Sequence, residues 1–306
     1  MITLSSIWPP HATSGKGDCE LEWPSAARMF ADAWELDWKR RVKYLVREAA
    51  TVSARRRALA ECAHNEFARA LLQSKPRAFY PLMSHLIDRR FGLNERVNAM
   101  LSSLRAMPRL LADEHLATIT QGHVELLALE DGSRLTLSLS GVSFHEGLLQ
   151  VGLLSPAGER LYSIGFGFTS DRDILIGNVQ GPSIGRGSLD DNRQLTHVSY
   201  GMRPPYLLLR ALRSLSIAWA LTGMMGIDPD NHIKGRWNLR RSRLKFDYRA
   251  FWSENGGCRS MRGNWALPLV MPTRELSDVP TRRRAMYRRR YEMLELLDEN
   301  ARHVAR

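Results

Sequence analysis

The segment RLYSIGFGFTSDRDILIGNVQG, residues 160–181, decides the fold class of this chain. In its first half Tyr162, Ile164 and Phe166 alternate with small residues, which is the period of a strand. The turn SDRD then interrupts the pattern, and a second apolar run, ILIGNVQ, follows at once. Because the connection is so short, the two strands are expected to pair antiparallel.

Two further apolar runs precede this pair of strands. RLTLSLS alternates leucine with Thr and Ser, and GLLQVGLL ends in the turn SPAGE. Four consecutive strands with short connections form an antiparallel meander. A short strand near residues 227–233 and a last strand in WALPLV are expected to extend it. The sequence therefore predicts an α+β fold around a mostly antiparallel central sheet.

Helical patterns lie on both sides of the meander. Residues 25–111 predict several amphipathic helices, with breaks at QSKPRAFYP and near Pro108. After the meander, SLDDNRQLTHVSY predicts a helix that stops at Gly201. RPPYLLLRALRSLSIAWALTGMMG then predicts a buried helix that ends at Gly223 or Gly226.

Two more helices are expected near the end of the chain. FDYRAFWSENGG is an aromatic helix that ends on paired glycines, and PTRRRAMYRRRYEMLELLDENA has the spacing of an amphipathic helix with an arginine-dense face. We therefore divide the chain into an N-terminal helical region, residues 1–118, a central sheet domain, residues 119–275, and a basic C-terminal helix, residues 276–306.

The charge of the chain points to an anionic partner. Its formal net charge is +12 over 306 residues. Residues 232–262 hold nine Lys or Arg against two acids, and residues 281–306 hold eight Arg against four acids. A basic surface of this kind suits nucleic acid, anionic lipid or a phosphorylated cofactor. Arginines that only solvate helix faces are the alternative.

The N-terminus and the cysteines bear on the compartment. The first residues lack a basic region followed by an apolar run, so no secretory signal is expected. Cys19, Cys62 and Cys258 lie far apart without a CxxC pair, which argues against a disulfide framework and a zinc knuckle. We expect a cytoplasmic protein, with peripheral contact with the inner membrane as the alternative.

The ordered set of segments resembles the VirK/YbjX family of bacterial proteins. The segments are EGLLQVGLL, LYSIGFGF, ILIGNVQG, LTHVSYGMRPPYLLL, FDYRAFWSENGG, LPL and RRRAMYRRRYEML. The resemblance covers residues 75–300. It implies a link to virulence and cell-envelope stress in enteric bacteria.

The order of elements is also similar to the GNAT acyltransferase fold. In that fold a late helix reads A..FY...GF, and Ala250, Phe251, Trp252, Gly256 and Gly257 occupy the matching places. A loop after the fourth strand holds the donor's pyrophosphate and reads Q/R-x-x-G-x-G/A. This chain has GPSIG after Gln180 there, with the glycines shifted. The resemblance implies transfer of an acyl group from acyl-CoA, or an aminoacyl group from aminoacyl-tRNA, to an amine on a small molecule or peptide.

Two segments compete as the donor or anion site. The first is the loop with Gln180 and Gly181, followed by Ser188 at a helix start whose free N–H groups carry partial positive charge. The second is YGMRPPY, where Gly201 permits left-handed backbone angles and Arg203 offers a planar fork for phosphate. The following two prolines remove amide donors there, so Arg203 would carry most of the binding. The alternative is that Arg203 only pairs with Asp190 or Asp191.

Proton transfer in an acyltransferase needs a base and an acid. We predict His232 as base and Tyr248 as acid, with His197 as a second candidate base. No metal-binding triad is expected. The opposing hypothesis is a non-catalytic VirK-type factor that binds RNA or anionic membrane through the basic surface. The rings proposed for acceptor binding or base stacking are Trp237, Phe246 and Trp252.

Overall fold

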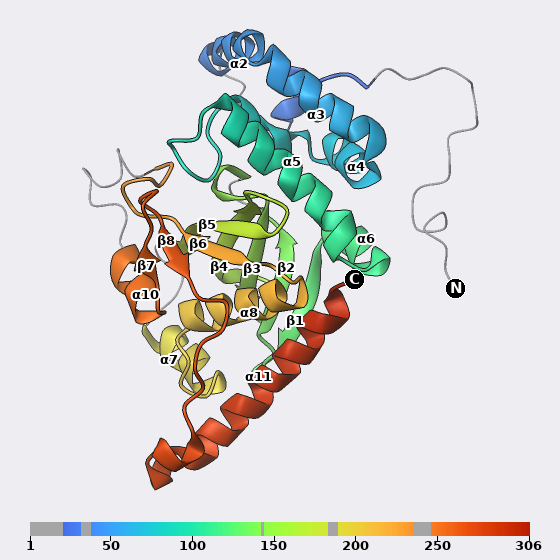
Figure 1. Cartoon of the computed structure of the whole chain (residues 1–306). Helices are drawn as coiled ribbons and strands as arrows, with labels where there is room; N and C mark the ends of the chain where they lie inside the picture. The colour runs from blue at the N-terminus through green and yellow to red at the C-terminus, as the bar shows by residue number, and fades with distance from the viewer. Residues whose placement is uncertain (1–20, 32–37, 142–143, 183–188, 235–245) are drawn as a thin grey trace.

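The computed structural model describes residues 21–31, 38–141, 144–182, 189–234 and 246–306 (Figure 1). Within these residues, eight strands form one sheet in the order β1-β2-β3-β4-β5-β6-β8-β7. The strands are β1 (His123–Ala128), β2 (Arg134–Leu139), β3 (Leu149–Leu154), β4 (Arg160–Phe168), β5 (Asp173–Gln180), β6 (Gly223–Gly226), β7 (Cys258–Arg259) and β8 (Trp265–Leu267). Neighbouring strands run antiparallel, except that β5 and β6 run parallel. The predicted meander is confirmed as β2 to β5.

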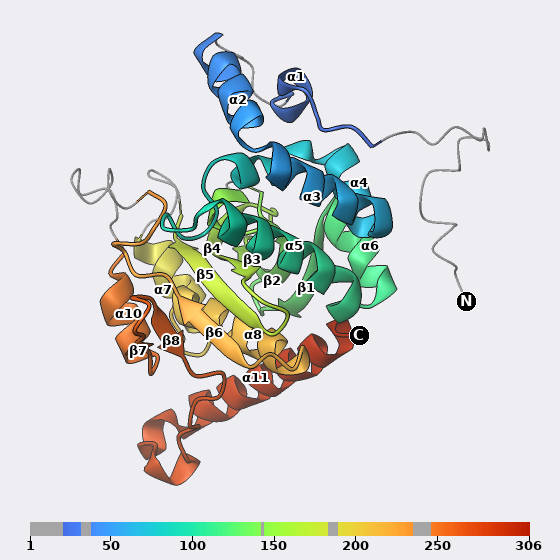
Figure 2. The same ribbon diagram turned by 45° about the horizontal axis from the view of Figure 1, so that its top comes forward.

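Helices cover both faces of the sheet (Figure 2). The helices before the sheet are α1 (Ala26–Met29), α2 (Trp38–Ala50), α3 (Val52–His64), α4 (Glu66–Ser74), η2 (Pro76–Met83), α5 (Leu93–Leu110) and α6 (Asp113–Gln121). The later helices are η3 (Phe144–Glu146), α7 (Leu189–Val198), α8 (Pro204–Ala218), α10 (Tyr248–Glu254), η4 (Leu276–Asp278), η5 (Thr281–Arg283) and α11 (Arg284–Val304). The mixed α+β class is therefore confirmed.

Strand β4 shows why both layers of helices can approach the sheet. On one face, the rings of Phe166 and Phe168 pack against Trp219 at the end of α8. On the other face, a Cβ atom at Gly167 would lie 2.7 Å from the side chain of Ile87 and 3.4 Å from Ser103 of α5. The small residues of the alternating pattern thus face the second helix layer and not solvent.

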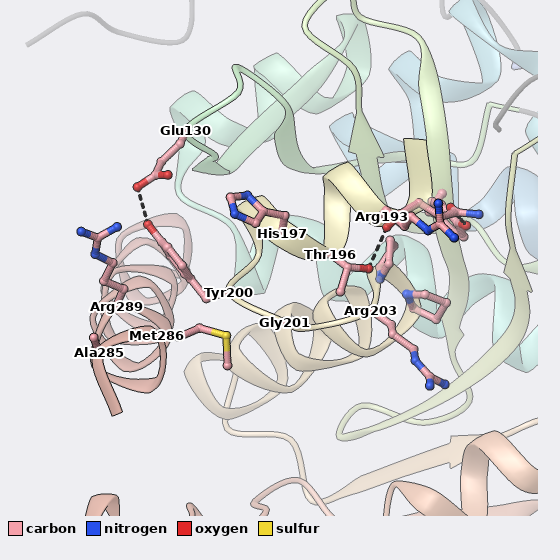
Figure 3. A pocket seen from close by; sticks show the side chains of 14 residues that line it. Glu130, Arg193, Thr196, His197, Tyr200, Gly201, Arg203, Ala285, Met286 and Arg289 are labelled. Atoms are coloured by element: carbon pink, nitrogen blue, oxygen red, sulfur yellow. Dashed lines mark hydrogen bonds between the residues drawn. The ribbon is translucent and has the colours of Figure 1, made fainter. Parts of the chain in front are cut away.

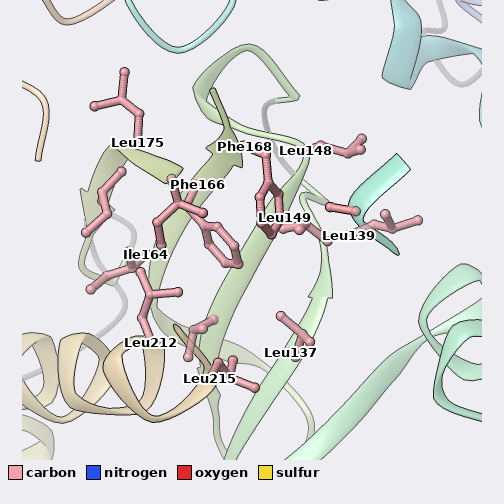
Figure 4. Close-up of a cluster of buried hydrophobic side chains, with 14 of the residues drawn as sticks. Leu137, Leu139, Leu148, Leu149, Ile164, Phe166, Phe168, Leu175, Leu212 and Leu215 are labelled. Atoms are coloured by element: carbon pink, nitrogen blue, oxygen red, sulfur yellow. The ribbon is translucent and has the colours of Figure 1, made fainter. Parts of the chain in front are cut away.

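The hydrophobic core lies on the α8 side of the meander and continues on the α5 side. Figure 4 shows Ile164 and Phe166 of the sheet close to Leu212 and Leu215 of α8, and all four side chains are fully buried. Side chains from all three predicted parts of the chain, from Ala54 to Val304, belong to one continuous cluster. The three-part division remains a prediction about folding units.

Several predicted boundaries were wrong. The buried helix ends at Ala218, before the glycines, and the next strand occupies Gly223–Gly226 instead of residues 227–233. Strand β1 was not predicted at all. α5 continues through Pro108, because the carbonyl group of Leu104, which the proline cannot bond, accepts a hydrogen bond from the Asn65 side chain at 3.2 Å.

Candidate anion-binding site

A hollow of about 990 Å³ lies between α7, the start of α8 and the first turns of α11 (Figure 3). Glu130 after β1 and Tyr162 of β4 also line it. The other lining residues are Asn192, Arg193, Thr196, His197, Tyr200, Gly201, Arg203, Pro204, Pro205, Ala285, Met286 and Arg289. The predicted residues Gly201, Arg203 and His197 are thus brought together in one cavity.

The turn between α7 and α8 forms one wall of this hollow. Tyr200 and Gly201 both have positive φ, 49° and 81°. A Cβ atom at Gly201 would lie only 2.8 Å from the guanidinium group of Arg290, so glycine allows α11 to approach. Arg290 in turn donates two hydrogen bonds to the carbonyl of Tyr200. The turn is therefore fixed to α11.

Three arginines from three different elements stand around the hollow. Arg193 lies on α7, Arg203 directly precedes α8, and Arg289 lies on α11; all three are exposed. Among the carboxylates whose side chains the structure describes, none forms an ion pair with Arg203 or Arg289. The acid of the lining, Glu130, accepts a hydrogen bond from the hydroxyl of Tyr200 at 2.6 Å. The lining therefore carries three guanidinium groups, with Arg289 on the α11 side of the hollow and Arg203 beside the start of α8 (Figure 3).

Apolar and aromatic side chains complete the lining. The hydroxyl of Tyr162 donates to the side chain of Asn192, and burial raises the pKa of this tyrosine, so it stays protonated. Pro204, Pro205 and Met286 contribute apolar surface. A site with cations at the rim and rings in its wall can hold a ligand that has both phosphate and planar or apolar parts.

The described start of the predicted loop after β5, Gln180 and Gly181, lies at the edge of the hollow. Gln180 is the last residue of β5 and is half-buried. A Cβ atom at Gly181 would lie 3.2 Å from the ring of Tyr162, which lines the hollow. Ser188 lies outside the described residues, so the predicted amide cradle at that position stays a prediction.

Tyr248 is not among the residues that line the hollow. It lies beside the end of β5 that β6 does not reach, a place that we call the wedge between β5 and β6. Its side chain is buried, and its hydroxyl accepts a hydrogen bond from the amide of Val179 at 3.1 Å and donates to the carbonyl of the same residue at 3.4 Å. Desolvation raises the pKa of Tyr248. The hydroxyl therefore completes the free edge of β5 where β6 has already ended.

His232 lies beside Tyr248, with 5.8 Å between ring centroids. Its Nδ1 accepts a hydrogen bond from the amide of Lys234 at 3.1 Å, which leaves the proton of the neutral ring on Nε2. Nε2 is buried, lies 3.8 Å from Glu146 Oε1, and has no hydrogen-bond partner in the described part of the chain. Desolvation lowers the pKa of His232. In this conformation the lone pair of the predicted base is already engaged.

The rings predicted for stacking differ in exposure. Trp252 is fully buried, and its Nε1 donates to the carbonyl of Ile227 at 3.0 Å, so it has no exposed face for a base. Phe246 is half-buried, and its ring contacts Tyr248 and Phe251, each at 5.1 Å between centroids. Trp237 lies outside the described residues.

The arginines near the start of α11 fall into two groups. Arg284 donates to the carbonyls of Val279 and Ser277, and Arg290 binds the α7–α8 turn, so these two have structural partners. The exposed group consists of Arg282, Arg283, Arg288 and Arg289. Sequence alone could not separate the two groups.

One cluster with metal-ligand chemistry joins α6 to the end of α11. Glu114, His115 and His303 place ligand atoms within 4.8 Å of one another. Nδ1 or Nε2 of histidine with a carboxylate oxygen suits zinc or another transition metal. The cluster could not be predicted from sequence, because 188 positions separate the two histidines. Glu114 and His303 are exposed and His115 is half-exposed, so the three side chains do not enclose a cavity. We therefore assign the cluster no function.

The fold and the hollow define a mixed α+β protein with a basic, partly aromatic site. The chain belongs to the DUF535 family, described as "Protein of unknown function (DUF535)", whose model matches residues 34–303. Its relatives include YbjX, so the resemblance to the VirK/YbjX family is confirmed. Among the helices of the described residues, none is long and apolar enough to span a bilayer.

Three relatives illustrate the range of similarity. An uncharacterized protein of Haemophilus influenzae Rd is 33% identical over 70% of this chain and 72% of its own length. The protein called "Membrane protein LapB" of Mannheimia haemolytica is 28% identical over 51% of this chain and 68% of its own. YbjX of Escherichia coli K12 is 25% identical over 42% of this chain and 40% of its own.

Proposed function

We propose that this protein binds RNA without catalysing a reaction, and that the hollow between α7, α8 and α11 holds RNA phosphates. The observation that carries the proposal is that Arg193, Arg203 and Arg289, from three different elements, line one cavity. Guanidinium groups bind phosphate oxygens in bidentate fashion. Proteins that bind single-stranded RNA combine such cations with rings on which bases stack, and Tyr162 and His197 supply rings here.

The basic surface continues beyond the hollow. The exposed Arg282, Arg283 and Arg288 lie around the start of α11, which reaches past the rest of the chain (Figure 1). The arginines that line the hollow would be enough to bind one small anion. The additional arginines outside it suit a longer ligand with many phosphates, such as a nucleic acid. A flat bilayer would not enter the hollow, so RNA is favoured over lipid at this end of the molecule.

Acyl or aminoacyl transfer is the second candidate. The parallel pair β5 and β6 at the centre of an otherwise antiparallel sheet, followed by an aromatic helix that ends before Gly256, supports a likeness to the GNAT fold. The side chain of Tyr248 fills the wedge between β5 and β6, however, and the lone pair of His232 is engaged. Because a donor would need that wedge, we place binding without chemistry first.

The experiment is a titration with a fluorescently labelled single-stranded RNA of about 12 nucleotides, followed by anisotropy. We expect binding by the wild type and a loss of about tenfold or more in Arg203→Ala/Arg289→Ala, since each removed guanidinium deletes charge-assisted hydrogen bonds. Arg56→Ala/Arg57→Ala is the matched control, because it removes two exposed arginines of α3 and therefore the same charge. Equal affinity of all three proteins would contradict the proposal.

Acyl-CoAs, aminoacyl-tRNA and anionic vesicles serve as competitors in the same titration. If acyl-CoA displaced RNA and the Tyr248 side chain moved out of the wedge, the result would favour the acyltransferase function. If anionic vesicles displaced RNA, the result would favour lipid as the ligand of the hollow and of the start of α11. The name of LapB describes the Mannheimia protein as a membrane protein, which makes the vesicle competition informative.

A further inference from the structure

Helix α2, Trp38–Ala50, makes its side-chain hydrogen bonds with the rest of the described residues through one face. Tyr44 is buried, and its hydroxyl donates to the carbonyl of Pro24 at 2.5 Å and accepts from Trp23 Nε1 at 3.1 Å. From the same face, Arg47 donates to the hydroxyl of Tyr80 at 2.5 Å. These contacts fix the orientation of the helix and therefore decide which side chains remain outside.

The outer face of α2 is apolar. Trp38 is 67% exposed, Val42 50%, Leu45 58% and Val46 63%. At about 100° per residue, these four side chains fall within an arc of about 100° on the side opposite Tyr44. The chain thus displays a continuous apolar stripe where a core-facing helix would show polar residues.

Cations flank the stripe on both sides. Around the helix axis, Lys39 and Lys43 lie about 20° and about 60° beyond Val46, which forms one edge of the stripe. Arg41 lies about 40° beyond Leu45, which forms the other edge. All three are exposed, and the ammonium of Lys39 lies 5.8 Å from the ring centroid of Trp38. An apolar arc bordered by Lys and Arg, with tryptophan among its members, is the composition of helices that lie in a membrane interface.

We propose that α2 binds the surface of an anionic lipid bilayer, with its apolar stripe inserted at the level of the headgroups. Lipid phosphates match the cations at both edges of the stripe, and the ring of Trp38 suits the boundary between headgroups and acyl chains. A second copy of this chain fits less well. Two stripes packed face to face would bring the cations of both helices together.

The position of α2 makes this contact compatible with the basic hollow. Figures 1 and 2 show α2 at the end of the molecule opposite the start of α11. A chain bound to a bilayer through α2 would therefore present the hollow away from the membrane. The inference rests on α2 alone and does not depend on RNA binding.

The test is flotation of the full chain with vesicles of phosphatidylglycerol and phosphatidylethanolamine, and with vesicles of phosphatidylcholine alone. We expect the wild type to float with the anionic vesicles only. Val42→Gln/Leu45→Gln, which removes two of the four apolar side chains of the stripe, and Lys39→Glu/Lys43→Glu, which reverses the charge of one edge, should each bind at least about tenfold more weakly. Because all four side chains are exposed, thermal unfolding should be unchanged.

Ile217→Gln/Leu296→Gln is the matched control, since it removes two apolar side chains that are 51% and 48% exposed on α8 and α11. It should float like the wild type. A second readout is the blue shift of tryptophan fluorescence on anionic vesicles, which should be smaller in Trp38→Phe. Flotation unaffected by the α2 substitutions, or no flotation at all, would overturn the proposal. A wild-type dimer that the stripe variant makes monomeric would assign the stripe to a second copy instead.

Discussion

The guanidinium group of Arg290 donates hydrogen bonds of 2.9 and 2.5 Å to the backbone carbonyl of Tyr200. Ninety positions separate the two residues, and their contact joins α11 to the turn between α7 and α8. The ring of Tyr287 lies 4.3 Å from the same guanidinium and holds it in place. Because Tyr200 and Gly201 have positive φ, the turn depends on such support. Arg290 thus shapes the hollow although it is not among the residues that line it.

The first prediction concerns this contact. Arg290→Ala should lower the free energy of unfolding by about 1 to 3 kcal/mol, because the partly buried carbonyl of Tyr200 loses its donors. Urea unfolding measures the change, and the exposed neighbour Arg288→Ala serves as the control with the same loss of charge. If both variants were equally stable, the structural role of Arg290 would be refuted.

The second prediction concerns the wedge between β5 and β6. Tyr248→Phe removes the hydroxyl that accepts from the amide of Val179, so we expect a loss of about 1 to 3 kcal/mol in the free energy of unfolding. RNA affinity should stay unchanged, since Tyr248 lies away from the hollow. A stable variant with altered ligand binding would instead indicate that the tyrosine acts on a ligand.

The third prediction concerns pH. Burial, with a further contribution from Lys234, lowers the pKa of His232 in the folded protein, and Glu146 acts in the opposite direction. The unfolded chain therefore binds more protons below about pH 6.5. The free energy of unfolding should fall as pH decreases from that value, by at most about 1.4 kcal/mol per pH unit for this group.

His85, His115 and His145 shift in the same direction, so the wild type combines several such contributions. His232→Asn keeps an acceptor for the amide of Lys234 but removes the titrating ring. Denaturant unfolding at several pH values should give a shallower acid dependence in this variant than in the wild type. An identical pH dependence would show that His232 does not contribute.

The meander could be predicted because its information is local. Short turns and alternating side chains determine where β2 to β5 lie in the sequence. Gly201, with its positive φ, marks the turn that follows helix α7. The continuation of α5 through Pro108 could not be predicted, because the compensating donor, Asn65, lies 39 positions before Leu104. A proline normally ends a helix unless a distant group satisfies the carbonyl that it leaves free.

The site was predictable only in part. YGMRPPY predicted Gly201 and Arg203 at a helix start, and both residues line the hollow in the structure, whereas their predicted role in anion binding stays a prediction. The contribution of Met286 and Arg289 depends on how α11 docks against α8, which the bidentate pair of Arg210 and Asp298 helps to fix. Arg289 and Arg290 are neighbours in sequence and cannot be distinguished there. They point about 100° apart around the axis of α11, so Arg289 lines the hollow whereas Arg290 binds the carbonyl of Tyr200.

The most direct test of RNA binding at the hollow is the salt dependence of the affinity for single-stranded RNA. Each neutralised phosphate contributes about −0.7 to the slope of log K against log salt concentration. We predict a steep slope for the wild type and a slope shallower by about 1.4 in Arg203→Ala/Arg289→Ala, because two phosphate contacts are lost. Identical slopes for the wild type and this variant would contradict RNA binding at the hollow.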